Sequence, residues 1–147
     1  MKLKFALIAI GCLFFASASA QNDISKDFGD YRVYYSIFNS SFITPEVADL
    51  YGLTRGANRA LVNISLVKVS DEGNSLGLPA QVTGQAQNLL MQSIPLRFIE
   101  IDEGDATYYL ASFTFEDQDP LHFTINVGHD GVRVPYEVKL TRTLYRD

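Results

Sequence analysis

The side chains best suited to catalysis in this sequence are two histidines, His122 and His129, and a single cysteine, Cys12. A serine hydrolase places a histidine base beside a nucleophile and an orienting acid, and the Gly-x-Ser-x-Gly motif that often marks the nucleophile does not occur. Catalytic zinc takes three protein ligands, typically with two histidines at helical spacing. Here His122 falls on the polar face of an expected strand and His129 in an expected turn. We interpret both as surface histidines and assign no catalytic residue, metal or cofactor.

Two acidic segments, residues 102–105 and 116–119, contain oxygen ligands of the kind that calcium binds. Their sequences, DEGD and EDQD, lack the Asp-x-Asp-x-Asp-Gly spacing of a calcium loop. We interpret both as solvated turns between strands.

The most informative polar cluster lies in a connection that precedes an expected strand and consists of Tyr51, Arg55, Asn58 and Arg59. Loops on a rigid scaffold often carry binding residues, and arginine suits bidentate recognition of carboxylate or phosphate. One hypothesis is that this cluster holds a small anion or a carboxylate of a partner protein. The preferred alternative is that one of the arginines ties the connection to the domain, by pairing with Glu46, Asp49 or Asp30.

The first 20 residues have the layout of a secretory signal peptide, with two lysines, an apolar run at 5–15 and small residues before Gln21. The run is shorter than the roughly 20 residues that span a bilayer. We predict cleavage near Ala20-Gln21, which leaves a single domain at 21–147. Cleavage removes Cys12; a lipoprotein acylated on that cysteine is the less favoured alternative, because the apolar run continues past it.

The predicted mature chain is acidic. Without the two lysines of the leader, ten basic residues remain against 17 acidic ones, a net charge of −7. Nucleic acid and anionic lipid surfaces both require a basic footprint. The charge therefore disfavours nucleic acid and anionic lipid surfaces, and we predict no nucleic-acid partner. No second apolar run suggests an integral membrane segment in the mature form.

The chain alternates apolar and polar residues in about seven segments, which predicts an all-β domain made of a sandwich or barrel. The expected strands are 31–39, 60–69, 80–88, 95–101, 106–115, 121–127 and 134–145, after a polar lead-in at 21–26. One short helix is expected at 45–51, in the first long connection, with Thr44 as N-cap and Gly52 at its end. Its apolar residues, which we expect to lie against the sheet, are Val47, Leu50 and Tyr51.

Four segments carry a resemblance to a known family: FGDYRVYYSIFNSSFITPEVADLYGLTRGANRALVNISL, AQVTGQAQNLL, IPLRFIEIDEGDATYYLASFTF and YEVKLTRTLY. Together they resemble domain-of-unknown-function family 4426, a group of small exported bacterial proteins. The resemblance covers essentially all of the predicted mature chain, and it implies a periplasmic, immunoglobulin-like antiparallel β-sandwich. It implies no activity and no catalytic residues.

Two functional hypotheses follow from these observations. The favoured one is a non-catalytic periplasmic binding, adaptor or chaperone-like module that contacts a protein partner in the cell envelope, through a sheet edge or the arginine-bearing loop. The alternative is a small periplasmic hydrolase or carbohydrate-active enzyme with a site between loops at one end of the sandwich. A histidine beside a serine and a carboxylate in a cleft would favour the second hypothesis.

Overall fold

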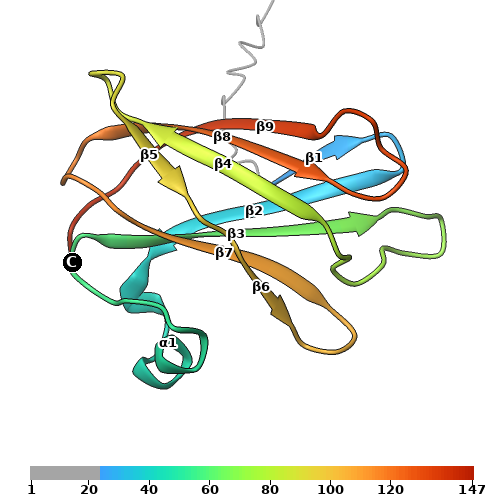
Figure 1. Ribbon diagram of the computed structural model, residues 1–147, viewed down its shortest axis with the longest axis horizontal. Helices are drawn as coiled ribbons and strands as arrows, with labels where there is room; N and C mark the ends of the chain where they lie inside the picture. Colours follow the sequence, from blue (N-terminus) through green and yellow to red (C-terminus); the bar gives the residue numbers. More distant parts are fainter. Residues whose placement is uncertain (1–23) are drawn as a thin grey trace, which may run out of the picture.

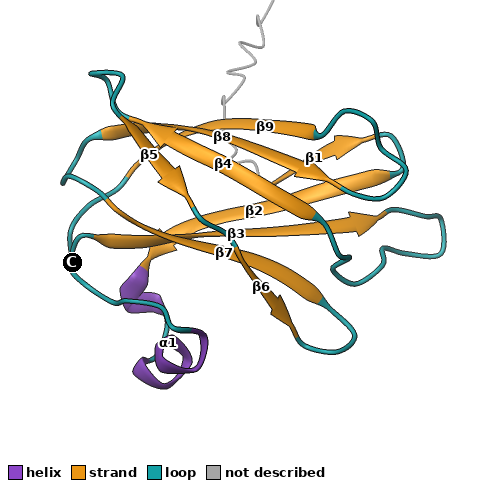
Figure 2. Ribbon diagram, viewed as in Figure 1, coloured by secondary structure: helices purple, strands orange, loops and turns teal. Residues whose placement is uncertain are grey.

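A computed structural model describes residues 24–147 as two antiparallel sheets that pack face to face (Figures 1 and 2). One sheet has the order β1-β2-β3-β7-β6, with β1 Ser25–Phe28, β2 Tyr31–Asn39, β3 Arg59–Lys68, β7 Thr107–Thr114 and β6 Ile99–Asp102. The other has the order β5-β4-β8-β9, with β5 Ser93–Leu96, β4 Gln81–Gln87, β8 Pro120–Gly128 and β9 Tyr136–Thr143. The predicted all-β sandwich is confirmed. The predicted signal peptide at 1–20 lies outside the described residues.

The core forms where the alternation predicts it. In β3, Val62, Ile64 and Leu66 have no exposed surface, while Asn63 and Ser65 lie on the opposite face. Strand β4 contributes small residues to the interior, and its Gly84 lies opposite the fully buried Ile125 of β8. The small inward face of β4 therefore leaves room for bulky neighbours in β8, as the sequence indicates.

Residues 24–147 form nine strands, and the two additional ones have separate causes. Strand β1 comes from the stretch expected as a polar lead-in, where it pairs with β2. The single strand expected at 95–101 is instead two short edge strands in different sheets, because β5 pairs with β4 whereas β6 pairs with β7. Pro95 has no N–H to donate, and it is tolerated because β5 is an edge strand.

The connection between β2 and β3 contains a 3-10 helix, η1 Ser40–Phe42, and the α-helix α1 Pro45–Tyr51. The predicted ends of α1 are confirmed: the Thr44 hydroxyl accepts a hydrogen bond from Val47 N (3.3 Å), and Gly52 has a left-handed backbone with φ 65°. None of the helices within residues 24–147 is long or apolar enough to span a membrane.

The predicted orientation of α1 is wrong. Val47 and Leu50 are 37% and 73% exposed, Tyr51 is only half-buried, and the buried residue of the helix is Ala48. In Figure 1, α1 lies below the left-hand part of the sheets and does not cover either of them. The helix has two turns, and its C-terminal loop folds back so that Leu53 N donates to Ala48 O (2.8 Å). This bond closes the C-terminal end of the helix, while Val47 and Leu50 remain exposed to solvent.

Tyr109 gives a pH-dependent prediction. Its side chain is buried in the core, and its hydroxyl accepts a hydrogen bond from Ala80 N at 2.7 Å. Burial raises the pKa of Tyr109 above its ordinary value, and burial also raises the pKa of Tyr136. At high pH the unfolded chain therefore loses these protons first, so the free energy of unfolding is expected to fall as the pH rises from about 10.

Urea denaturation at pH 8 and at several values above 10 measures this fall. Tyr109→Phe is expected to reduce the alkaline slope and to lower stability at pH 8 by about 1–2 kcal/mol, because Ala80 N–H loses its acceptor. Tyr145→Phe alters an exposed side chain and is the control at pH 8. An unchanged alkaline slope in Tyr109→Phe would contradict the assignment.

Candidate functional site

The structure gives the four predicted site residues different roles, and it places Tyr51 half-buried at the end of α1. The guanidinium of Arg59 is bound internally, because Nε donates to Thr54 O (3.2 Å) and Nη2 donates to Ser112 Oγ on β7 (3.0 Å). Arg55 is exposed and makes no hydrogen bond or ion pair to another residue of the described range 24–147. Asn58 holds β7 through its backbone, since its carbonyl accepts from Phe115 N (2.9 Å). Arg59 is thus a structural tie, and Arg55 is available to a ligand.

A buried serine closes the connection that carries Arg55. Ser40 Oγ accepts a hydrogen bond from Gly56 N (2.9 Å) and donates to Gly56 O (3.0 Å), and Ser40 has no exposed surface. The two ends of the connection are therefore joined next to Arg55. Arg55 lines a cavity of about 350 Å³ together with Ser41, Gly56, Ala57 and Asp147. The loop thus offers a cationic side chain on a fixed backbone, with open space beside it.

Large apolar side chains lie exposed on the same connection. Phe42 is 79% exposed, and its ring lies nearly perpendicular to that of Phe38, with 6.5 Å between centroids. Val47 and Leu50 of α1 are exposed as described above. The density of apolar residues in FITPEVADLYGL, a segment with a helix of only two turns, is the sequence signal for this surface. We call Phe42, Val47, Leu50 and Arg55 the connection surface.

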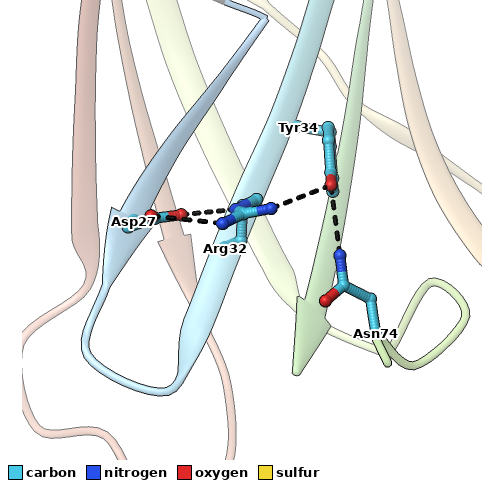
Figure 3. Close-up of polar contacts among 4 residues, drawn as sticks. All are labelled: Asp27, Arg32, Tyr34 and Asn74. Carbon is cyan, nitrogen blue, oxygen red and sulfur yellow. Dashed lines mark hydrogen bonds and ion pairs between the residues drawn. The ribbon is translucent and has the colours of Figure 1, made fainter. Parts of the chain in front are cut away.

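The expected pairing of an arginine with Glu46, Asp49 or Asp30 is not what the structure shows, because both partners of Arg59 are uncharged oxygens. Among the described residues, Arg32 forms an ion pair with Asp27 (Figure 3). Hydrogen bonding from Arg32 lowers the pKa of Asp27, and the same contact raises the pKa of Arg32. This pair joins β1 to β2. The sequence pattern does not predict β1 and therefore could not predict the pair.

The ion pair extends into a short polar network on the outer face of the five-stranded sheet (Figure 3). Arg32 Nη1 donates to the hydroxyl of Tyr34 (3.3 Å), and Asn74 Nδ2 donates to the same hydroxyl (3.2 Å). Asn74 belongs to the connection after β3, so the network links β1, β2 and that connection. Its groups bond to one another, which indicates a structural role.

Neither histidine has the neighbours of a catalytic base. His122 Nδ1 lies 2.8 Å from Thr141 Oγ1 on the outer face of the four-stranded sheet. His129 lies 3.0 Å from both the Asp130 carbonyl and the Tyr136 hydroxyl, and its ring packs on Tyr31 at 4.2 Å. Among described residues, the serine and carboxylate that would favour the hydrolase hypothesis are not beside either ring.

An aspartate in each acidic turn accepts a hydrogen bond from a backbone N–H group. Asp102 Oδ1 accepts from Gly104 N (2.9 Å) in the β6–β7 turn, and Asp117 Oδ1 accepts from Arg146 N (2.8 Å). Within residues 24–147, no three side chains of His, Cys, Asp or Glu gather into a group that could hold a metal ion. The Asp102 contact is that of an Asx turn, whereas the Asp117 contact ties the C-terminal segment to the turn at 116–119.

Substitutions of the two arginines are expected to change stability by different amounts. Arg59→Ala is expected to lower the free energy of unfolding by about 1–2 kcal/mol, since it removes hydrogen bonds that join the connection to β7. Arg55→Ala is expected to change it by less than about 0.5 kcal/mol, because Arg55 is an exposed side chain without a partner in the described range. Thermal unfolding of the ligand-free protein measures both. Equal losses from the two variants would contradict the division of roles.

Three comparisons relate the chain to known proteins. The family profile described as Domain of unknown function (DUF4426) matches residues 25–147. The chain is similar to the crystal structure of a DUF4426 family protein from Pseudomonas aeruginosa PAO1, with 32% sequence identity, a TM-score of 0.73, and coverage of 84% of this chain and 94% of that one. A comparison with curated protein sequences finds no match.

The fold also resembles that of FetP from uropathogenic Escherichia coli strain F11, a protein expressed recombinantly in the periplasm of E. coli. That structure has 12% identity and a TM-score of 0.59, and the match covers 83% of this chain and 93% of FetP. A copper-bound variant of FetP has 12% identity and a TM-score of 0.58, with coverage of 83% and 94%. At this identity the likeness shows a shared fold.

Proposed function

The chain belongs to the DUF4426 family, and from this premise and the geometry of the connection surface we propose that it is a non-catalytic binding module that holds a protein partner in the periplasm. The leader predicted at 1–20 supports export. The observation that carries the proposal is the combination, on one closed connection, of exposed apolar side chains and an arginine without a partner within residues 24–147.

The chemistry of this surface defines the partner. Aromatic and arginine side chains are enriched among the residues that dominate binding energy at protein interfaces, and the connection surface offers Phe42 and Arg55. The apolar side chains gain by burial against an apolar surface, while Arg55 requires an acceptor, for which a carboxylate is the strongest common match. We therefore expect a partner that presents an apolar patch next to an aspartate or glutamate.

The position of the helix supports docking. Because α1 does not cover a sheet, its exposed side is not part of the core. A partner can therefore contact this side without disturbing the packing of the core. The Ser40–Gly56 hydrogen bonds already order the backbone around Arg55, which reduces the entropy lost on binding. A partner can therefore bind without unfolding any part of the sandwich.

The experiment is in-cell photo-crosslinking from position 50, with the exported protein in its envelope environment. We expect Leu50 replaced by a photoreactive residue to capture one envelope protein, and the capture to be lost with Arg55→Ala. Arg133→Ala, which removes an exposed arginine elsewhere, is the matched charge control. A photoreactive residue at Leu76, also an exposed leucine, is the control for position. Recovery of monomer alone, or the same adduct from position 76, would overturn the proposal.

A further inference from the structure

The loop between β4 and β5 presents three consecutive large apolar side chains to solvent. Leu89, Leu90 and Met91 are 63%, 78% and 72% exposed, and the loop projects beyond the sheets at the upper left of Figure 1. Single exposed apolar residues are common, whereas a contiguous group is typical of an interaction surface. We call these three residues the hairpin tip.

Hydrogen bonds hold the hairpin tip in its exposed position. Asn88 Oδ1 accepts from Leu90 N (3.0 Å) and from Gln92 N (2.9 Å), and Asn88 Nδ2 donates to Gln92 Oε1 (2.7 Å). Two backbone bonds, from Asn88 N to Gln92 O (3.2 Å) and from Met91 N to Asn88 O (3.0 Å), complete the turn. One asparagine thus orders the whole loop, so the apolar side chains cannot fold back onto the sheet without breaking it.

Met91 adopts a backbone conformation that glycine or asparagine would occupy with less strain. Its φ is 62°, in the left-handed region that a long side chain rarely takes. If only stability mattered, a small residue such as glycine would be favoured at this position. The loop instead presents a third large apolar side chain at its most strained position, which favours a role in binding.

The surroundings of the hairpin tip carry negative charge. A cavity of about 180 Å³ lies between the loop and the acidic turn at 116–119, and its polar lining includes Glu116 and Asp119. Neither carboxylate makes an ion pair with a residue of the described range. The floor of the cavity is apolar, with Ile94, Phe115 and Leu121. A partner that covers the tip would therefore place its own adjacent side chain next to uncompensated carboxylates.

We propose that the hairpin tip and the adjoining acidic cavity bind a protein segment that is both apolar and basic, with its apolar face on Leu89, Leu90 and Met91 and a lysine or arginine near Glu116 and Asp119. Charge complementarity selects this occupant, because the same carboxylates and the net negative charge of the predicted mature chain repel anionic lipid. The hairpin tip and its acidic cavity share no residue with the connection surface. Each of the two proposals can therefore be tested independently of the other.

The test is a titration of the isotopically labelled protein with a synthetic amphipathic peptide of leucine and lysine, monitored by NMR. We expect chemical-shift changes at residues 88–92 and 116–119. Leu90→Asn is expected to weaken binding by at least about tenfold, and so is the double variant Glu116→Gln, Asp119→Asn. The matched controls are Leu76→Asn and the double variant Asp102→Asn, Asp105→Asn in the β6–β7 turn, each expected to change the affinity by less than about twofold.

Several results would overturn the proposal. The absence of binding at millimolar peptide would do so, as would shift changes centred elsewhere, including on α1. Equal binding of a leucine–glutamate peptide would show that charge does not select the partner. Broadening of the tip resonances by phosphatidylcholine vesicles in the absence of peptide would assign the tip to a membrane, and concentration-dependent shifts without peptide would assign it to a second copy of the chain.

Discussion

Replacing Phe123 with alanine is expected to lower the free energy of unfolding by about 3–5 kcal/mol. Phe123 lies on β8 and is 1% exposed, and its ring meets that of Phe113 on β7 edge to face, with 5.5 Å between centroids. The pair therefore joins the two sheets at the centre of the core. Truncation removes both the burial of the ring and this aromatic contact, and it leaves a cavity that rigid strands cannot fill.

The measurement is urea or thermal denaturation, and the expected fall in melting temperature is on the order of 10–20 °C for a domain of this size. Phe42→Ala is the matched control, because it removes the same ring from a position that is 79% exposed. We expect Phe42→Ala to alter stability by less than about 0.5 kcal/mol and to weaken partner binding. A similar loss from both variants would show that Phe42 belongs to the core.

Replacing Gly77 with alanine is expected to destabilise the domain by about 2–3 kcal/mol. A Cβ at this position would lie 2.3 Å from the Thr107 carbonyl oxygen and 3.0 Å from Ser65 Oγ. Because the nearer atom belongs to the backbone, a change of side-chain rotamer cannot relieve the contact. The shift that follows would disturb the hydrogen bond from Thr107 N to Gly77 O (3.0 Å), which attaches the connection after β3 to β7.

Gly128→Ala is the matched control for Gly77→Ala. A Cβ at Gly128 has Gln81 Oε1 as its nearest neighbour at 3.5 Å, an ordinary contact with a movable side chain. Chemical denaturation of both variants is expected to show a large loss for Gly77→Ala and a change within about 0.5 kcal/mol for Gly128→Ala. Equal stabilities for the two variants would contradict the close backbone approach at Gly77.

The elements that depend on neighbouring residues could be predicted from the sequence. The alternation in β3 and β8 determines which side chains enter the core, since successive residues of a strand point to opposite faces. The ends of α1 depend on Thr44 and Gly52, which act through the backbone of the helix itself. The predicted fold class is confirmed by the two antiparallel sheets, and the family resemblance is confirmed by the match at 25–147.

The features that depend on distant parts of the chain could not be predicted in this way. The stretch 95–101 is predicted as one strand by alternation, and its division depends on which neighbour, β4 or β7, is available at each end. The orientation of α1, with Ala48 buried and Leu50 exposed, depends on where the connection places the helix relative to the sheets. An amphipathic pattern indicates which side of a helix is apolar, but a helix of two turns can leave that side in solvent.

The interaction partners of the arginines also could not be predicted from neighbouring residues. Arg32 pairs with Asp27 because the register of β1 on β2 places these residues opposite each other. The partners of Arg59 come from its own loop and from β7, which is more than 50 positions away in the sequence. Composition identifies arginines on a connection as candidates for binding or for structural ties, and the register of the sheet then decides which role each has.

Both proposed surfaces lie at one end of the sandwich. The connection surface follows the end of β2, and the hairpin tip follows the end of β4, on the left of Figure 1. The connection surface contributes Arg55, whose cavity is also lined by Asp147, whereas the hairpin tip lies beside Glu116 and Asp119. The two proposed surfaces therefore offer different charged groups to a partner.

The most direct test of the central claim is a measurement of the dissociation constant between this protein and the partner captured from position 50. It is made with purified components, for the wild type and for Arg55→Ala. A charge-assisted hydrogen bond contributes roughly 1.5–3 kcal/mol, so the account predicts binding about 10- to 100-fold weaker for Arg55→Ala. Arg133→Ala is predicted to bind like the wild type. A dissociation constant for Arg55→Ala within about twofold of the wild type would contradict the assignment of the connection surface as the binding site.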